Sequence, residues 1–164
     1  MPAWSPEIAN EFIKLASQHR RPLNQLVLQR LVYLAHGWCL AIHDAPLTGD
    51  RPEAWTSGPV YRRLAEALAA QDRRPVASEI ELESPSLENG PELDHSQKDI
   101  ILKVYHSYEH FSETRLSDLA VREPSPWGAV FDGGKGKFRD IPHNLIRAQF
   151  LEIAARLSED SRDD

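Results

Sequence analysis

Two pairs of residues stand at spacings that could ligate a metal ion. His36 and Cys39 lie three positions apart, and His106 and His110 lie four apart, so each pair would share one face of a helix. A zinc finger needs a second Cys/His pair at finger spacing, and none follows. The zinc-protease motif HExxH places its general-base glutamate directly after the first histidine, and Ser107 stands there instead. We therefore predict no metal site and interpret these histidines as structural or solvent-exposed.

The glycine-rich segment 133–137, Gly-Gly-Lys-Gly-Lys, suggests a phosphate-binding loop. The Walker motif, however, places four residues between its glycines and then Lys-Ser/Thr at the start of a helix. Here Lys137 precedes Phe138, and we expect no helix to start at that point. A flexible turn is therefore favoured over anion binding, and nucleotide hydrolysis is favoured less still.

Nucleophilic catalysis is not indicated either. A serine hydrolase would carry a GxSxG elbow, which the sequence lacks. Cys39 lies in the most apolar segment, where burial would raise the pKa of its thiol and disfavour the reactive thiolate. It is the only cysteine, so an internal disulfide is excluded, which suits a reducing cytosol. We predict that the chain is not an enzyme and has no catalytic residue and no cofactor. The alternative is a metal- or anion-dependent enzyme that uses His36, His106, His110 or the loop 133–137.

The aromatic residues beside turns are better candidates for function. Trp, Tyr and Arg are the residue types that most often anchor protein–protein contacts. We predict a partner-binding surface next to the expected turn at Gly58-Pro59. Its residues are Trp55, Tyr61, Arg62 and Arg63. The other interpretation is that Trp55 and Trp127 seal the edge of the core, and for these two residues it is preferred.

Length and charge limit the classes of protein to consider. The chain has 164 residues, a formal charge of −6 and a pI of about 5.6, so its overall field would repel nucleic acid. The longest apolar run, residues 31–42, is far shorter than the ~20 residues that span a membrane. The N-terminus lacks the basic and apolar regions of a signal peptide. We expect a soluble cytoplasmic protein with one domain over residues 1–158 and a disordered acidic tail over 159–164.

The hydrophobic pattern predicts a mostly α-helical α+β fold. Residues 25–43 are apolar on all sides, which is typical of a buried central helix. Ser5-Pro6-Glu7 suggests the start of a helix that ends near His19, with Ser5 as its cap. Residues 84–94 are interpreted as a surface loop. Further helices are predicted at 60–71, 95–110, 116–121, 127–131 and 142–158, and strands of a small antiparallel sheet at 53–55, 77–82 and 138–141.

Several short motifs occur in an order that resembles a known family. They are Tyr33–Trp38 (YLAHGW), Pro46-Leu47, Glu53–Trp55 (EAW), Gly58–Val60 (GPV), Leu116-Ser117 with Leu119, Ser125–Trp127 (SPW), and Ile141, Ile146 and Phe150. Together they resemble the Panacea domain, the SocA-like antitoxin domain that is also found in phage-associated proteins. The resemblance covers about residues 23–150, and the order of the first four motifs is its most specific part.

Two features depart from the family pattern. Ala120-Val121 stand where such proteins often carry Thr-His, which weakens an enzymatic interpretation further, and the loop 133–137 is longer than expected. The resemblance also marks a set of motif residues for which we expect structural roles. They are His36, Gly37, Trp38, Pro46, Trp55, Gly58, Pro59, Ser125, Pro126 and Trp127.

The resemblance implies an antitoxin that binds and neutralises a cognate toxin protein. An alternative role is that of a proteolytic adaptor, which delivers the toxin to an ATP-dependent protease. An acidic protein also suits a basic toxin, because opposite fields speed association. We expect hydrophobic and aromatic contacts to dominate affinity, with Arg62 and Arg63 or the acidic segment 79–94 setting specificity.

Overall fold

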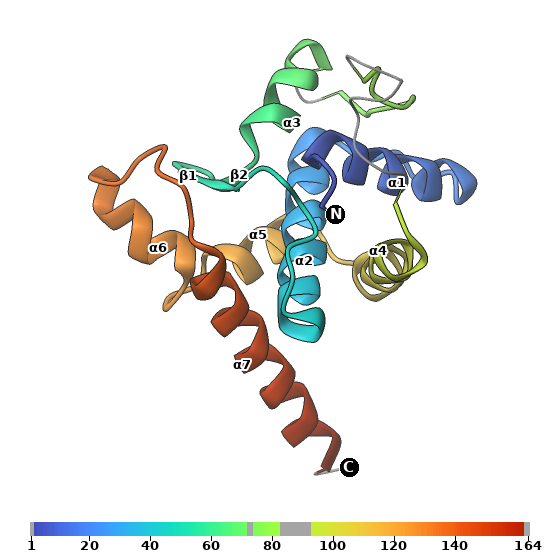
Figure 1. Cartoon of the computed structure of the whole chain (residues 1–164). Coiled ribbons are helices and arrows are strands. Elements are labelled where there is room, and N and C mark those ends of the chain that lie inside the picture. The colour runs from blue at the N-terminus through green and yellow to red at the C-terminus, as the bar shows by residue number, and fades with distance from the viewer. Residues whose placement is uncertain (1, 72–73, 83–92, 163–164) are drawn as a thin grey trace.

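Seven α-helices and one β-hairpin make up the described part of the chain, which comprises residues 2–71, 74–82 and 93–162 of a computed structural model (Figure 1). This architecture confirms the predicted mostly α-helical α+β class. The elements are α1 (Ser5–Gln18), α2 (Gln25–His43), β1 (Glu53–Trp55), β2 (Gly58–Val60), α3 (Arg62–Ala67), α4 (His95–Tyr108), α5 (Glu113–Val121), α6 (Pro126–Phe131) and α7 (His143–Arg162), with short 3-10 turns at Ala69–Gln71 and Asp132–Gly134.

Helix α2 passes through the middle of the molecule, and α1, α4, α5 and α7 pack around it (Figure 1). Its first turn is capped by the Asn24 side chain, which accepts a hydrogen bond from the backbone N–H of Val27 at 2.9 Å. Twelve of its 19 residues are buried. The predicted central helix at 25–43 is therefore confirmed. Among the described residues, no helix combines the length and apolarity needed to cross a membrane.

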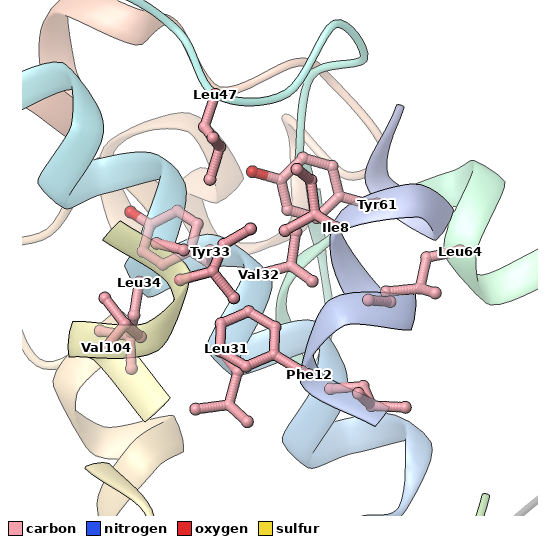
Figure 2. Close-up of a cluster of buried hydrophobic side chains, with 14 of the residues drawn as sticks. Ile8, Phe12, Leu31, Val32, Tyr33, Leu34, Leu47, Tyr61, Leu64 and Val104 are labelled. Carbon is pink, nitrogen blue, oxygen red and sulfur yellow. The ribbon is translucent and has the colours of Figure 1, made fainter. Parts of the chain in front are cut away.

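The hydrophobic core joins α2 to the helices on both sides of it (Figure 2). Leu31, Val32 and Leu34 of α2 are at most 2% exposed. The side chains clustered around them come from several elements and are Ile8 and Phe12 of α1, Leu47, Tyr61, Leu64 of α3 and Val104 of α4. Each buried side chain of this size stabilises the fold by about 1.5–3 kcal/mol relative to an exposed one. The core thus fixes α3 and the segment before it against α1 and α2.

The sheet differs from the predicted one. β1 and β2 pair antiparallel, with Trp55 opposite Gly58, so Gly58–Val60 is a strand and not the expected turn. The segment 138–141 contributes one bridge, between Asp140 and Glu53. The predicted strand at 77–82 is wrong over its described residues. The backbone of Ile80 there bonds to a side chain instead, because its N–H donates to Asn10 Oδ1 at 2.7 Å and its carbonyl accepts from Asn10 Nδ2 at 3.0 Å.

Two helix ends also differ from expectation. α1 has Trp4 at its N-cap position without a side-chain cap, and Ser5 bonds instead to Asp50 through its N–H at 2.8 Å and its hydroxyl. α7 continues to Arg162, so residues 159–162 are helical where a disordered tail was expected. Residues 163–164 and residues 84–92 of the expected loop lie outside the described part of the chain.

The two halves of α7 have different surroundings. Its buried residues, Ile146 and Phe150, both lie in the first half, which packs against α2. From residue 155 onward every described side chain is exposed. Figure 1 shows this second half extending away from the other helices toward the C-terminus.

Candidate partner-binding surface

The residues considered as metal ligands do not form a metal site in the described part of the chain, where no group of three His, Cys, Asp or Glu side chains could hold an ion. Cys39 is buried, and desolvation raises the pKa of its thiol to about 11. His106 and His110 both contact the Glu109 carboxylate, at 3.4 and 3.0 Å, on an exposed surface. The thiol of Cys39 is therefore buried and protonated, as predicted, and His106 and His110 are exposed to solvent.

Three backbone amides of the loop 133–137 donate to carbonyls in the loop or just before it. The N–H of Lys135 donates to Asp132 O at 3.2 Å, that of Gly136 to Phe131 O at 2.9 Å, and that of Lys137 to Gly134 O at 3.3 Å. A phosphate-binding loop instead directs such N–H groups at the anion. The geometry favours the predicted turn over an anion site.

Polar residues of α2 hold the β1–β2 hairpin and the residues after it. Gln29 forms two hydrogen bonds with the backbone of Tyr61, one to its carbonyl at 3.1 Å and one from its N–H at 2.8 Å. Because its amide satisfies both backbone groups, Tyr61 is pinned against α2 with its ring in the core. The side chain of Tyr61 is 0% exposed, so it does not belong to the surface that we predicted for it.

Arg30, the next residue of α2, holds the β1–β2 hairpin in the same way, through hydrogen bonds to its backbone. It is only 1% exposed, and its guanidinium donates to Pro59 O at 2.7 Å, Ser57 O at 2.5 Å and Ser117 Oγ of α5 at 3.3 Å. No carboxylate of the described residues forms an ion pair with it. Burial lowers the pKa of Arg30 to about 10, which still leaves it charged at neutral pH. Between the two carbonyls lies Gly58 at φ 126°, where a Cβ would approach the guanidinium to 2.7 Å.

His36 connects α2 to the segment before β1 and to α7. Its Nδ1 accepts hydrogen bonds from the backbone N–H groups of Leu47 and Thr48, at 3.2 and 3.3 Å. The ring proton must then sit on Nε2, which lies 3.1 Å from His143 Nδ1 and donates to it. Burial, with the neighbouring His143, lowers the pKa of His36 to about 3. Both ring nitrogens of this uncharged histidine are therefore engaged in internal hydrogen bonds.

The next two motif residues contact α7 and α4. Gly37 lies against the ring of Phe150, and a Cβ at position 37 would come within 2.1 Å of that ring. The indole of Trp38 packs edge-on to Phe150 at 5.4 Å and donates to the Tyr108 hydroxyl of α4 at 3.0 Å. Pro46, by contrast, is half-buried in the loop before the buried Leu47.

The SPW motif starts α6 and attaches it to β1. Ser125 caps the helix by accepting from the N–H of Gly128 at 3.0 Å, and Pro126 is buried at the first helical position. The indole N–H of Trp127 donates to the carbonyl of Trp55 at 2.6 Å. These contacts are those expected of structural residues.

Of the predicted partner-binding residues, Trp55 and Arg62 lie together. Arg62 forms two hydrogen bonds with the carboxylate of Glu53, at 2.9 and 3.1 Å, and its guanidinium lies 5.5 Å from the Trp55 ring centre. Arg63 points elsewhere, with its guanidinium 3.8 Å from the ring centre of Trp4. The Trp4–Arg63 pair lines a separate polar hollow of about 540 Å³ between α1, α3 and residues 76–82.

Phe138, which was not predicted as a functional residue, lies next to Trp55 and Arg62 in the structure. Its ring packs edge-on to Trp55 at 5.5 Å, lies 5.7 Å from the Arg62 guanidinium and 5.0 Å from Lys137 Nζ, and its side chain is 48% exposed. We call Trp55, Arg62, Lys137 and Phe138 the Phe138 surface. The φ of Phe138 is 71°, which costs about 1–3 kcal/mol for a residue other than glycine. Nothing in the sequence signals this backbone conformation.

The comparisons with known proteins agree with the motif pattern. The family model described as antitoxin SocA-like, Panacea domain, matches residues 28–128, which run from α2 into α6. Antitoxin SocA from Caulobacter vibrioides (strain NA1000 / CB15N) is 26% identical over 131 residues, covering 77% of this chain and 69% of the relative. No solved structure matched the chain. Because the family model covers more than half of the sequence, the chain belongs to the SocA-like antitoxin family with a Panacea domain.

Proposed function

We propose that this protein is the antitoxin of a toxin–antitoxin pair and neutralises its cognate toxin by direct protein–protein binding. Family membership over residues 28–128 carries the proposal, since a relative in that family is named an antitoxin. We place this action in the cytoplasm and assign it to a single domain that includes α7 as far as Arg162.

The buried polar residues of α2 are compatible with a role of this chain in binding. Gln29, Arg30 and His36, the polar residues buried in α2, each direct their hydrogen-bonding groups to the protein's own backbone and side chains. Binding would then fall to surface residues. Trp55 and Arg62 remain our proposed contacts, because tryptophan and arginine are frequent anchors of interfaces.

The proposal is tested by expressing the product of the neighbouring gene with and without this chain. We expect that product to arrest growth alone, growth to recover when the chain is co-expressed, and the two proteins to co-purify. A neighbouring product that is harmless alone, or that stays lethal beside this chain, would contradict the proposal.

Toxin lifetime in the same cells distinguishes occlusion from the alternative role as a proteolytic adaptor. We favour occlusion, in which the toxin persists in a silent complex after synthesis is stopped. A toxin that disappears only when the chain is present, and persists when ATP-dependent proteases are deleted, would establish delivery instead.

A further inference from the structure

Phe138 combines an exposed aromatic ring with a backbone conformation that disfavours it. Its φ of 71° lies in the left-handed region, where glycine or asparagine is normally found. The backbone is held there by Ala54 of β1, which accepts from the N–H of Phe138 at 2.7 Å and donates to the carbonyl of Arg139 at 2.9 Å. These bonds use backbone atoms only. A glycine at position 138 could keep both of them without steric strain.

Burial does not account for the ring at this position. The side chain of Phe138 is 48% exposed, and its aromatic neighbour, Trp55, is also bonded through its indole N–H to Glu53 at 3.0 Å. A phenylalanine that is strained, half in water and marginal to the core contributes little to folding. Residues held in such conformations cluster at binding and switch regions.

The charges around the ring differ in sign from those of the whole chain. The chain carries −6, yet residues 132–140 hold three cations, Lys135, Lys137 and Arg139, against two carboxylates, Asp132 and Asp140. Lys137 is exposed beside the ring, and in the described part of the chain it forms no ion pair with a carboxylate. Arg62, on the other side, is already neutralised by Glu53. The unmatched charge of the Phe138 surface is therefore positive.

We propose that Phe138 anchors a docking surface for the toxin, and that the docked segment of the toxin carries an apolar side chain next to a carboxylate. The apolar group would pack on the exposed part of Phe138, and the carboxylate would pair with the ammonium of Lys137, which lies over the ring and forms no ion pair among the described residues. Charge complementarity selects this occupant, since a basic segment would be repelled by Lys137. The inference rests on the proposed function and adds to it the residue and the local chemistry of the contact.

The main experiment measures affinity and stability together, using the purified product of the neighbouring gene as the ligand. Phe138→Gly should weaken binding at least about tenfold, as expected for an interface anchor, while the urea midpoint of the chain stays the same or rises. Phe138→Asn should behave in the same way. The matched control is Ile42→Ser, which removes a side chain that is 59% exposed on α2, and it should leave binding unchanged.

A charge series tests the carboxylate. Lys137→Glu should weaken binding and Lys137→Arg should preserve it. Lys98→Glu makes the same change in net charge on an exposed residue of α4 and should have little effect. Equal losses with Lys98→Glu and Lys137→Glu would mean that only net charge matters, and would overturn the local contact.

The remaining outcomes separate this inference from the proposed function. A parent chain that neither binds nor neutralises the toxin overturns both. A parent that binds while Phe138→Gly binds equally tightly overturns the docking surface alone, as does a Phe138→Gly variant that unfolds at clearly lower urea. Aromatic rings beside cations can also bind single-stranded nucleic acid, with the bases stacked on the rings and the phosphates near the cations. If single-stranded DNA binds the parent and displaces the toxin, the surface serves nucleic acid and the inference fails.

Discussion

Arg30 and Arg62 show how one residue type is used in two opposite ways. Arg30 is 1% exposed, forms no ion pair at contact distance with a carboxylate of the described residues, and holds the backbone carbonyls of Ser57 and Pro59. Arg62, a few residues beyond that hairpin, is exposed and pairs with Glu53 over two aromatic rings. Removing the first should leave the buried carbonyl of Pro59 without its donor and release the carbonyl of the exposed Ser57, whereas removing the second returns an ion pair to water. The fold therefore depends on Arg30, whereas Arg62 lies on the surface and is available to contact a partner protein.

Among the proposed variants, a substitution of Arg30 should destabilise the protein most. Arg30→Met keeps the apolar stem but removes the donors to Ser57 and Pro59, and the buried carbonyl of Pro59 left unpaired costs about 1–3 kcal/mol. We expect a loss of about 1–3 kcal/mol in the free energy of unfolding, measured by urea denaturation. A loss below about 1 kcal/mol would show that water replaces the guanidinium and that these hydrogen bonds are dispensable.

Gly37 extends the comparison to the contact between α2 and α7. Gly37→Ala would drive a methyl group into the ring of Phe150, and overpacking of a close contact costs about 1–3 kcal/mol. Gly37→Ala combined with Phe150→Leu should recover part of that loss, since a smaller side chain opens the required space. Urea midpoints of both single variants and the double variant would measure the coupling. Additive losses would mean that the two residues do not press on each other.

His36 predicts how the interior responds to acid. Its pKa is about 3 in the folded protein, against an ordinary value of 6.5, so below pH 6.5 the unfolded chain binds a proton that the folded chain does not. Stability contributed by the uncharged ring is present above pH 6.5 and is lost as the pH falls toward 3, at about 1.4 kcal/mol per pH unit. His143 acts in the same direction, because burial and Arg51 lower its pKa.

Urea denaturation at a series of pH values would measure this slope. His36→Asn should flatten it, even if the variant is less stable at every pH, because the titrating ring is gone. An unchanged slope in His36→Asn would assign the acid sensitivity to other groups.

Arg62 should give the smallest change in stability. Arg62→Met removes an exposed ion pair with Glu53, and such pairs contribute little in water. The urea midpoint should move little, and toxin binding should weaken. If Arg62→Met unfolds as easily as Arg30→Met, the division between interior and surface arginines is wrong.

The sequence predicted correctly those helices that are determined by residues close to one another in the chain. The apolar residues of α2, together with the Asn24 cap, were sufficient to predict a buried central helix at 25–43. The short helix predicted at 127–131 was also found, one residue earlier at its start, as α6 (Pro126–Phe131). In these cases the residues that determine the structure are neighbours in the chain.

Predictions failed where distant residues decide the structure. Gly58-Pro59 was expected to turn, but Arg30 holds it in a strand, and the turn falls on the two residues before it. Tyr61 beside two arginines suggested a surface position, but Gln29 fixes its backbone in the interior. The left-handed backbone of Phe138 depends on Ala54, more than 80 positions earlier in the sequence.

The projecting half of α7 has a consequence for how the molecule opens. A helix of this length gains most of its stability from side-chain burial, and every side chain of residues 155–162 is exposed. Their amide hydrogens should exchange with solvent by local fraying, whereas the amides near Ile146 and Phe150 should exchange only when the core opens. The protein thus carries a terminal segment that can unwind repeatedly while the rest of the molecule stays native.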